Sequence, residues 1–187
     1  MNKQMLVIGG SKGIGKSIVD YFNATNYSRL NGFDITDSAV REKIAQNSLA
    51  YDIIVNHAYT VENHQLDMLS AVVNTWIDNS KSGIIINTGT ISTYRDIFKD
   101  SETWRRYVAN KAALDSYCKG VAKRCQENKF KFKITNIKPG MLDTEKSRSK
   151  PHFTTGITGN DYCQLIEFIL STPDNICLPE IVIESKE

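Results

Sequence analysis

A glycine-rich turn between a strand and a helix limits what this chain can fold into more than any other feature of its sequence. The apolar run Met5-Leu6-Val7-Ile8 leads into Gly9-Gly10-Ser11-Lys12-Gly13-Ile14-Gly15, after which apolar side chains recur at helical spacing. We therefore predict a buried strand over residues 4–9 and a helix over residues 14–22. Glycines permit a tight turn, and the free N–H groups at the start of a helix attract phosphate. The turn predicts a phosphate site, with an ordinary strand–turn–helix corner as the alternative.

Apolar strands and amphipathic helices alternate along the rest of the chain. We expect further strands over residues 28–34, 52–55, 83–87, 130–137 and 176–183, and further helices over residues 38–48, 63–79, 102–127 and 161–170. Residues 145–160 are expected to form a loop. This alternation predicts a single Rossmann-like α/β domain over residues 1–187, with a doubly wound parallel sheet of about six strands and helices on both faces.

The composition excludes several classes of protein. A length of 187 residues, with 41% hydrophobic and 24% charged residues, fits one globular domain. A net charge of +2 gives no argument for a nucleic-acid or membrane partner. No segment resembles a transmembrane helix or a signal peptide, and the four cysteines lack a Cys-x-x-Cys spacing, so we expect a cytoplasmic protein with reduced thiols. No histidine has the spacing of a metal ligand.

A tyrosine and a lysine, Tyr107 and Lys111, lie four residues apart in the helix predicted over residues 102–127. Residues at this spacing share one face of a helix. The lysine charge would stabilise a tyrosinate and lower the tyrosine pKa below its ordinary value of about 10. Such a tyrosine can give a proton to a carbonyl oxygen or take one from an alcohol. A solvated surface pair is the alternative for this motif alone.

The order of these motifs along the chain resembles that of the short-chain dehydrogenase/reductase family. The glycine spacing is similar to the family's T-G-x-x-x-G-x-G turn, with Ile8 in place of threonine, and Tyr107 and Lys111 match its Y-x-x-x-K motif. The resemblance covers roughly residues 4–144. The family usually has another strand–helix unit after the first helix, so we interpret this chain as a shortened member and predict the sheet order 2-1-3-4-5-6.

The resemblance implies a role for each matching polar residue. Tyr107 would be the general acid/base, and Lys111 would hold the cofactor ribose and tune Tyr107. Thr90 occupies the position of the family's catalytic serine, with Ser92 as a rival two residues on. Asn74 matches an asparagine that holds a water in the family's proton relay, and we expect it to be buried on the apolar face of its helix. A solvent-facing asparagine is the alternative.

The resemblance also implies a nicotinamide dinucleotide as cofactor. Lys12 and, as a further candidate, Arg29 favour the 2′-phosphate of NADP(H), whereas Asp34, expected at the end of the second strand, favours the ribose hydroxyls of NAD(H). The alternatives are that Asp34 matches the family's adenine-contacting aspartate and that Arg29 is only an exposed residue. We expect NADP(H) rather than NAD(H). His57 and Tyr59 depart from the family's N-N-A-G segment. The residues expected to contact the cofactor are Gly9, Ser11, Lys12, Gly13, Ile14, Gly15, Asp34, Ile35, Asn56, Ala58, Tyr107, Lys111, Pro139, Gly140 and Thr144.

The expected function is therefore hydride transfer between a nicotinamide and a small carbonyl or alcohol substrate. The alternative is a catalytically idle cofactor-binding or scaffold protein on the same fold. Residues 145–160 would form a substrate lid with Lys146, Arg148, Lys150 and His152, which indicates either an anionic substrate or a solvated basic loop. By resemblance we expect a homodimer or homotetramer.

Overall fold

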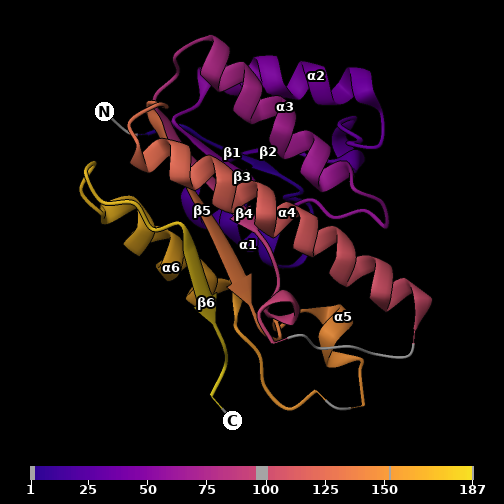
Figure 1. Cartoon of the computed structure of the whole chain (residues 1–187). Coiled ribbons are helices and arrows are strands. Elements are labelled where there is room, and N and C mark those ends of the chain that lie inside the picture. The colour runs from indigo at the N-terminus through magenta and orange to yellow at the C-terminus, as the bar shows by residue number, and fades with distance from the viewer. Residues whose placement is uncertain (1–2, 96–100, 152, 187) are drawn as a thin grey trace.

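One parallel sheet of six strands forms the centre of the computed structural model, which describes residues 3–95, 101–151 and 153–186 (Figure 1). All neighbouring strands run parallel, in the order β2-β1-β3-β4-β5-β6. This confirms the predicted sheet order. The strands are β1 Met5–Ile8, β2 Thr25–Tyr27, β3 Ile53–Asn56, β4 Gly83–Thr88, β5 Phe132–Pro139 and β6 Glu180–Ile183.

Helices cover both faces of the sheet. Helices α2, α3 and α4 lie on one face, and α1 and α6 pack together on the other (Figure 1). The helices are α1 Gly13–Phe22, α2 Ser38–Asn47, α3 His64–Asp78, α4 Glu102–Gln126, α5 Glu145–Arg148 and α6 Gly159–Ser171, with short 3-10 helices η1 Arg29–Asn31, η2 Ser48–Ala50 and η3 Ile91–Thr93.

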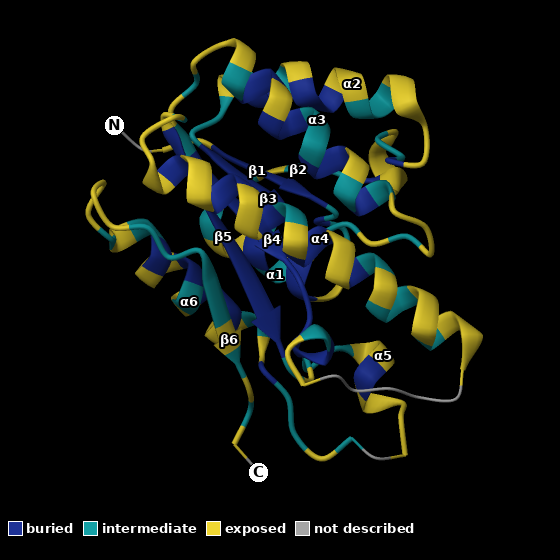
Figure 2. Ribbon diagram, viewed as in Figure 1, coloured by how far each residue is buried: buried dark blue, intermediate teal, exposed yellow. Residues whose placement is uncertain are grey.

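The core consists of two apolar layers separated by the sheet. Successive side chains of a strand point to opposite faces. Thus Leu6 and Ile8 pack in the layer under α2, α3 and α4, whereas Met5 and Val7 pack in the layer against α1 and α6. The strands of the sheet interior are accordingly buried along their length (Figure 2). Because both faces are covered, ligands can reach this sheet mainly at the ends of its strands.

The second strand lies earlier in the chain than predicted. The segment over residues 28–34 is not a strand: β2 ends at Tyr27, and η1 follows at once. Ser28 forms a capping box with Asn31, and Gly32 has a φ of 89°, so the chain turns away from the sheet. The consequence is that Ser28 and Arg29, rather than Asp34, stand directly after the strand.

The segment over residues 145–160 is also not wholly a loop. Its first four residues form α5, because the Thr144 hydroxyl caps this turn by accepting a hydrogen bond from the Ser147 N–H at 3.2 Å. The segment ends in α6, which starts at Gly159. Over the ranges that the structure describes, no helix has the length and apolar character needed to cross a bilayer.

Candidate active site

The glycine-rich turn packs tightly around the carboxyl end of β1. A Cβ added at Gly9 would lie 2.6 Å from the Ala58 Cα, and one added at Gly15 would lie closer than 3.0 Å to the Gly9 carbonyl oxygen. Helix α1 begins directly after the turn, and the side chain of its N-cap residue, Lys12, makes no capping hydrogen bond. The first N–H groups of α1 therefore remain available to a phosphate.

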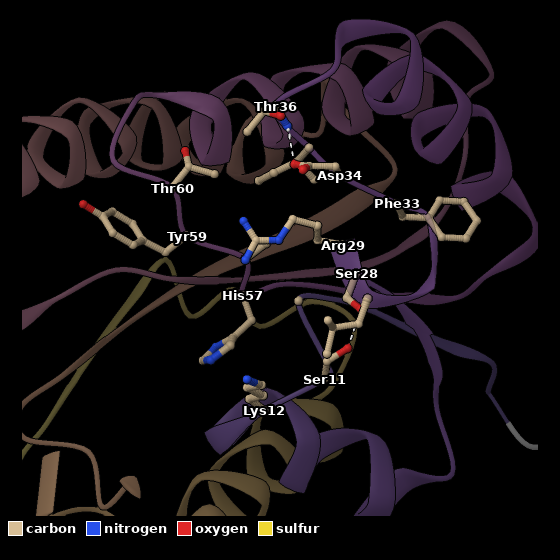
Figure 3. A pocket seen from close by; sticks show the side chains of 14 residues that line it. Ser11, Lys12, Ser28, Arg29, Phe33, Asp34, Thr36, His57, Tyr59 and Thr60 are labelled. Atoms are coloured by element: carbon tan, nitrogen blue, oxygen red, sulfur yellow. Dashed lines mark hydrogen bonds between the residues drawn. The ribbon is translucent and has the colours of Figure 1, made fainter. Parts of the chain in front are cut away.

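A cavity of about 340 Å³ lies beside this turn, at the carboxyl ends of β1, β2 and β3. Lys12 and Arg29 line it and point their cationic ends into it (Figure 3). Ser28 lines the same cavity, where its hydroxyl is hydrogen-bonded to that of Ser11. Two cations and two hydroxyls thus surround one concave site, a combination suited to a phosphate monoester.

Asp34 borders this cavity but serves a local turn. Its carboxylate accepts a hydrogen bond from the Thr36 N–H at 3.1 Å, and this backbone hydrogen bond, with one from the Thr36 side chain, lowers the pKa of Asp34 (Figure 3). The expected position at the end of a strand is wrong, since Asp34 lies seven positions after Tyr27, the last residue of β2. The preference for NAD(H) that was inferred from Asp34 at a strand end therefore loses its basis.

A second cavity, of about 530 Å³, lies at the carboxyl ends of β4 and β5. Tyr107, Lys111 and Thr90 all line it. His57 and Tyr59 line both cavities, so the two form neighbouring parts of one long site along the edge of the sheet. A ligand longer than either cavity could therefore extend from the glycine-rich turn to Tyr107.

Burial has the largest effect on the pKa of Tyr107. Burial raises the pKa of Tyr107, and a side-chain hydrogen bond with Thr90 only partly offsets that effect. The expected lowering by Lys111 is wrong for this structure, because the lysine Nζ lies 5.9 Å from the centre of the Tyr107 ring and hydrogen-bonds elsewhere. Tyr107 consequently carries its proton at neutral pH.

Lys111 is buried and held by two acceptors. Its Nζ donates to the Thr88 carbonyl oxygen and to Gln65 Oε1, each at 2.7 Å. The Gln65 amide is fixed in turn, since its Nε2 donates to the backbone oxygens of Asn56 at 3.2 Å and Thr88 at 3.0 Å. Burial lowers the pKa of Lys111 to about 7. One ammonium N–H remains for another acceptor.

Gln65 was missed by the sequence analysis. A signal was present, because Gln65 precedes Leu69, Val72 and Trp76 at helical spacing and all four residues are buried. A polar residue on such a stripe needs a partner. Asn74 was expected to be buried and to hold a water of a proton relay, but it is exposed: it follows the exposed Asp67 by seven residues, on the outer stripe of α3. The prediction of a buried Asn74 is therefore wrong.

A buried row of amides ties the strand ends together. Asn56, Asn87 and Asn136 occupy paired positions on β3, β4 and β5. Asn56 Nδ2 donates to Asn87 Oδ1 at 2.9 Å, and Asn87 Nδ2 donates to Asn136 Oδ1 at 2.8 Å. Beyond them, the buried Lys138 pairs with Asp115 at 2.8 Å. These contacts fix the register of the three strands whose ends carry the site.

His57 is linked to the opposite face of the sheet. Its Nδ1 lies 3.0 Å from the Thr88 hydroxyl, which in turn lies 2.9 Å from the Tyr162 hydroxyl. Burial lowers the pKa of His57 to about 4, and the charge of Lys111 acts in the same direction. The imidazole is therefore neutral at physiological pH, and it adds no cation to the site.

The structure gathers most of the remaining predicted residues at these cavities. Thr90 lines the second cavity whereas Ser92 does not, although the two hydroxyls are 3.3 Å apart, so the geometry favours Thr90. Thr144 packs against the turn, 3.4 Å from where a Gly13 Cβ would lie. His152 lies outside the described residues. Ile35 and Ala58 line the first cavity, Pro139 and Gly140 line the second, and Ile14 is buried in α1.

Comparison with known proteins supports the fold. No protein-family model matches the sequence, and no curated protein matches it either. Among solved structures, 4-hydroxyisoleucine dehydrogenase complexed with NADH superposes with a TM-score of 0.76 at 17% identity, over 97% of this chain and 97% of that one. A short-chain dehydrogenase from Burkholderia cenocepacia J2315 in complex with NADP gives 0.75 at 19% identity, over 97% and 87%.

The same comparison includes a protein with a different name. Ribose-5-phosphate isomerase from Brucella melitensis 16M superposes with a TM-score of 0.74 at 14% identity, over 97% of this chain and 90% of that one. Similarity of fold at such identities does not decide the reaction. The resemblance inferred from the motifs is confirmed at the level of architecture: this chain has the fold of the short-chain dehydrogenases/reductases.

Proposed function

We propose that this protein is a nicotinamide-dependent oxidoreductase of short-chain dehydrogenase/reductase type that reduces a small carbonyl compound, with NADP(H) preferred. The observation that carries the proposal is the continuity of the two cavities through His57 and Tyr59. A dinucleotide whose phosphates lie at the glycine-rich turn would bring its nicotinamide beside Tyr107. The dehydrogenases with the same fold that are complexed with NADH or NADP support this choice of ligand.

The residues present fit such a cofactor. The uncapped start of α1 offers N–H donors to a pyrophosphate. A Cβ at Gly9 or Gly15 would clash with neighbouring backbone atoms, so glycine at these two positions keeps the turn compact. Lys111, with one N–H unused, is suited to a ribose hydroxyl. Lys12 and Arg29 would meet a 2′-phosphate in the first cavity, which is the basis for preferring NADP(H).

The bound nicotinamide would supply a hydride to the carbonyl carbon, and the protein would supply the proton. Tyr107 is the proton donor, since burial raises its pKa and keeps the phenol protonated. Thr90, hydrogen-bonded to Tyr107, would donate to the same carbonyl oxygen and orient it. The product is an alcohol, with one hydride on carbon and one proton on oxygen. Gln65 would act indirectly, by holding Lys111 in place.

A catalytically idle protein on this fold is the second candidate. The threonine at position 90 and the unusual His57 segment favour it, whereas the placement of Tyr107, Thr90 and Lys111 on one cavity favours the enzyme. The test is reduction of a panel of small carbonyl compounds with NADPH by the wild type, Tyr107→Phe and the control Tyr21→Phe. Tyr21 lies on α1 and is 46% exposed. We expect Tyr107→Phe to abolish turnover while it binds NADPH normally, and Tyr21→Phe to behave as wild type. Equal turnover by Tyr107→Phe would remove the tyrosine from the mechanism.

A further inference from the structure

We infer that the substrate carries a carboxylate, which is bound by Lys146 and Lys150 on the wall of the second cavity. This inference rests on the proposed function for its carbonyl chemistry, but the anion site itself can be tested by binding. Both lysines line the cavity that also contains Tyr107 and Thr90. The sequence left open whether this basic segment binds an anion or is merely solvated, and its place on the cavity wall favours the anion.

Among the described residues, the second cavity is lined by cationic side chains and by no acidic ones. Three lysines line it, and neither aspartate nor glutamate does. Lys111 donates to Gln65 and Thr88, and its remaining N–H is proposed to bind the cofactor ribose. Lys146 and Lys150 have no ion-pair partner within residues 3–95, 101–151 and 153–186. Unpaired charge of one sign in a concave site attracts a ligand of the opposite sign.

A nearby acid, Asp143, is already paired with another cation. Arg148 binds Asp143 through two hydrogen bonds, from Nε at 2.5 Å and from Nη2 at 3.0 Å. The pair therefore neutralises itself. The same ion pair and the buried Ser147 hold α5 in place, and Lys146 within α5 and Lys150 just beyond it both line the cavity.

The shape of the cavity limits the rest of the substrate. Trp104, Tyr107 and Tyr59 form an aromatic wall, with rings of neighbouring residues 5.2–5.3 Å apart. The volume of about 530 Å³ must also hold the nicotinamide ring. The structure thus favours a short oxo acid: a carbonyl at Tyr107, an apolar body against the aromatic wall and a carboxylate at the lysines. Lysine binds a carboxylate mainly as a point charge, so several chain lengths fit.

The two lysines are not needed for the cofactor phosphates. They do not line the first cavity, where Lys12, Arg29 and the start of α1 already provide positive charge. A substitution at Lys146 and Lys150 should accordingly change substrate binding and leave cofactor binding unchanged.

The test compares short oxo acids with their methyl esters in the presence of NADPH. The variants are Lys146→Met/Lys150→Met and, as a matched control, Lys123→Met/Lys129→Met, which changes two exposed lysines outside the described cavities. We expect the wild type to favour the acids, and the first variant to lose about 10- to 100-fold in kcat/KM for the acids through KM, because a charge-assisted contact contributes about 1.5–3 kcal/mol. Its kcat/KM for the esters and its Kd for NADPH should stay as in the wild type.

A binding measurement tests the anion site independently of the proposed reductase activity. Quenching of tryptophan fluorescence by an oxo acid, measured with NADP⁺ present, should occur in the wild type and weaken in the first variant. Binding of the acid without any turnover would refute the proposed reductase and retain the anion site. Three results would overturn the anion site: no binding of the acid, equal use of acids and esters, or loss of NADPH affinity in the first variant.

Discussion

Replacing Gly15 by alanine tests the packing of the phosphate turn directly. The added Cβ would lie closer than 3.0 Å to the Gly9 carbonyl oxygen and 3.1 Å from the His57 Cδ2. The first contact is with backbone, which cannot rotate away. Overpacking of this kind costs about 1–3 kcal/mol. Because about 1 kcal/mol changes Tm by roughly 2–4 °C in a chain of this size, we expect a Tm lower by about 2–12 °C.

Gly120 provides the matched control. It also lies in a helix, α4, and a Cβ added there meets no atom within 4 Å. Alanine in an open helical position stabilises by about 0.5–1 kcal/mol, so Gly120→Ala should raise Tm by roughly 1–4 °C. Thermal unfolding followed by circular dichroism measures both changes. If both variants were equally stabilised, the tight packing around Gly15 would be refuted.

Two further predictions concern the polar groups of the site. Gln65→Leu should raise the Kd for NADPH and lower kcat/KM with it, because Lys111, which is proposed to hold the cofactor ribose, loses one acceptor, while Gln65→Glu should restore part of the NADPH affinity; equal NADPH affinity and activity of all three proteins would remove Gln65 from the site. His57→Gln should weaken the dependence of stability on pH between about 6.5 and 4. The folded-state pKa of His57 is depressed to about 4, so below pH 6.5 the unfolded state takes up a proton that the folded state refuses, and stability falls as the pH falls through this window. Denaturant unfolding of variant and wild type over this range checks it, and identical profiles would contradict it.

The regular part of the fold was predictable because its signals are local. Apolar runs such as Ile84–Ile86 define elements within a few positions, and so do capping residues such as Asp37, which accepts a hydrogen bond from the Ala39 N–H at 2.8 Å. The second strand was misplaced because Thr25–Tyr27 is short and only partly buried, so it has no apolar run.

The site was less predictable because its contacts join distant parts of the chain. Tyr107 and Thr90 were identified through the motif, and both line one cavity. Gln65 accepts a hydrogen bond from Lys111, 46 residues away, and no local pattern reports such a contact. Asn74 was placed by motif alone, although the helical period puts it on the outer stripe of α3. The expected homo-oligomer stays a prediction.

The measurement that tests the account most directly is a thermal-shift titration with NADPH and, separately, NADH. A ligand at a hundred times its dissociation constant stabilises by about 2.7 kcal/mol, which corresponds to roughly 5–10 °C here. We predict a clear shift with NADPH and a smaller one with NADH at equal concentration, because Lys12 and Arg29 face the cavity where a 2′-phosphate would lie. A folded sample that shifts with neither nucleotide would contradict the proposed cofactor site and, with it, the oxidoreductase.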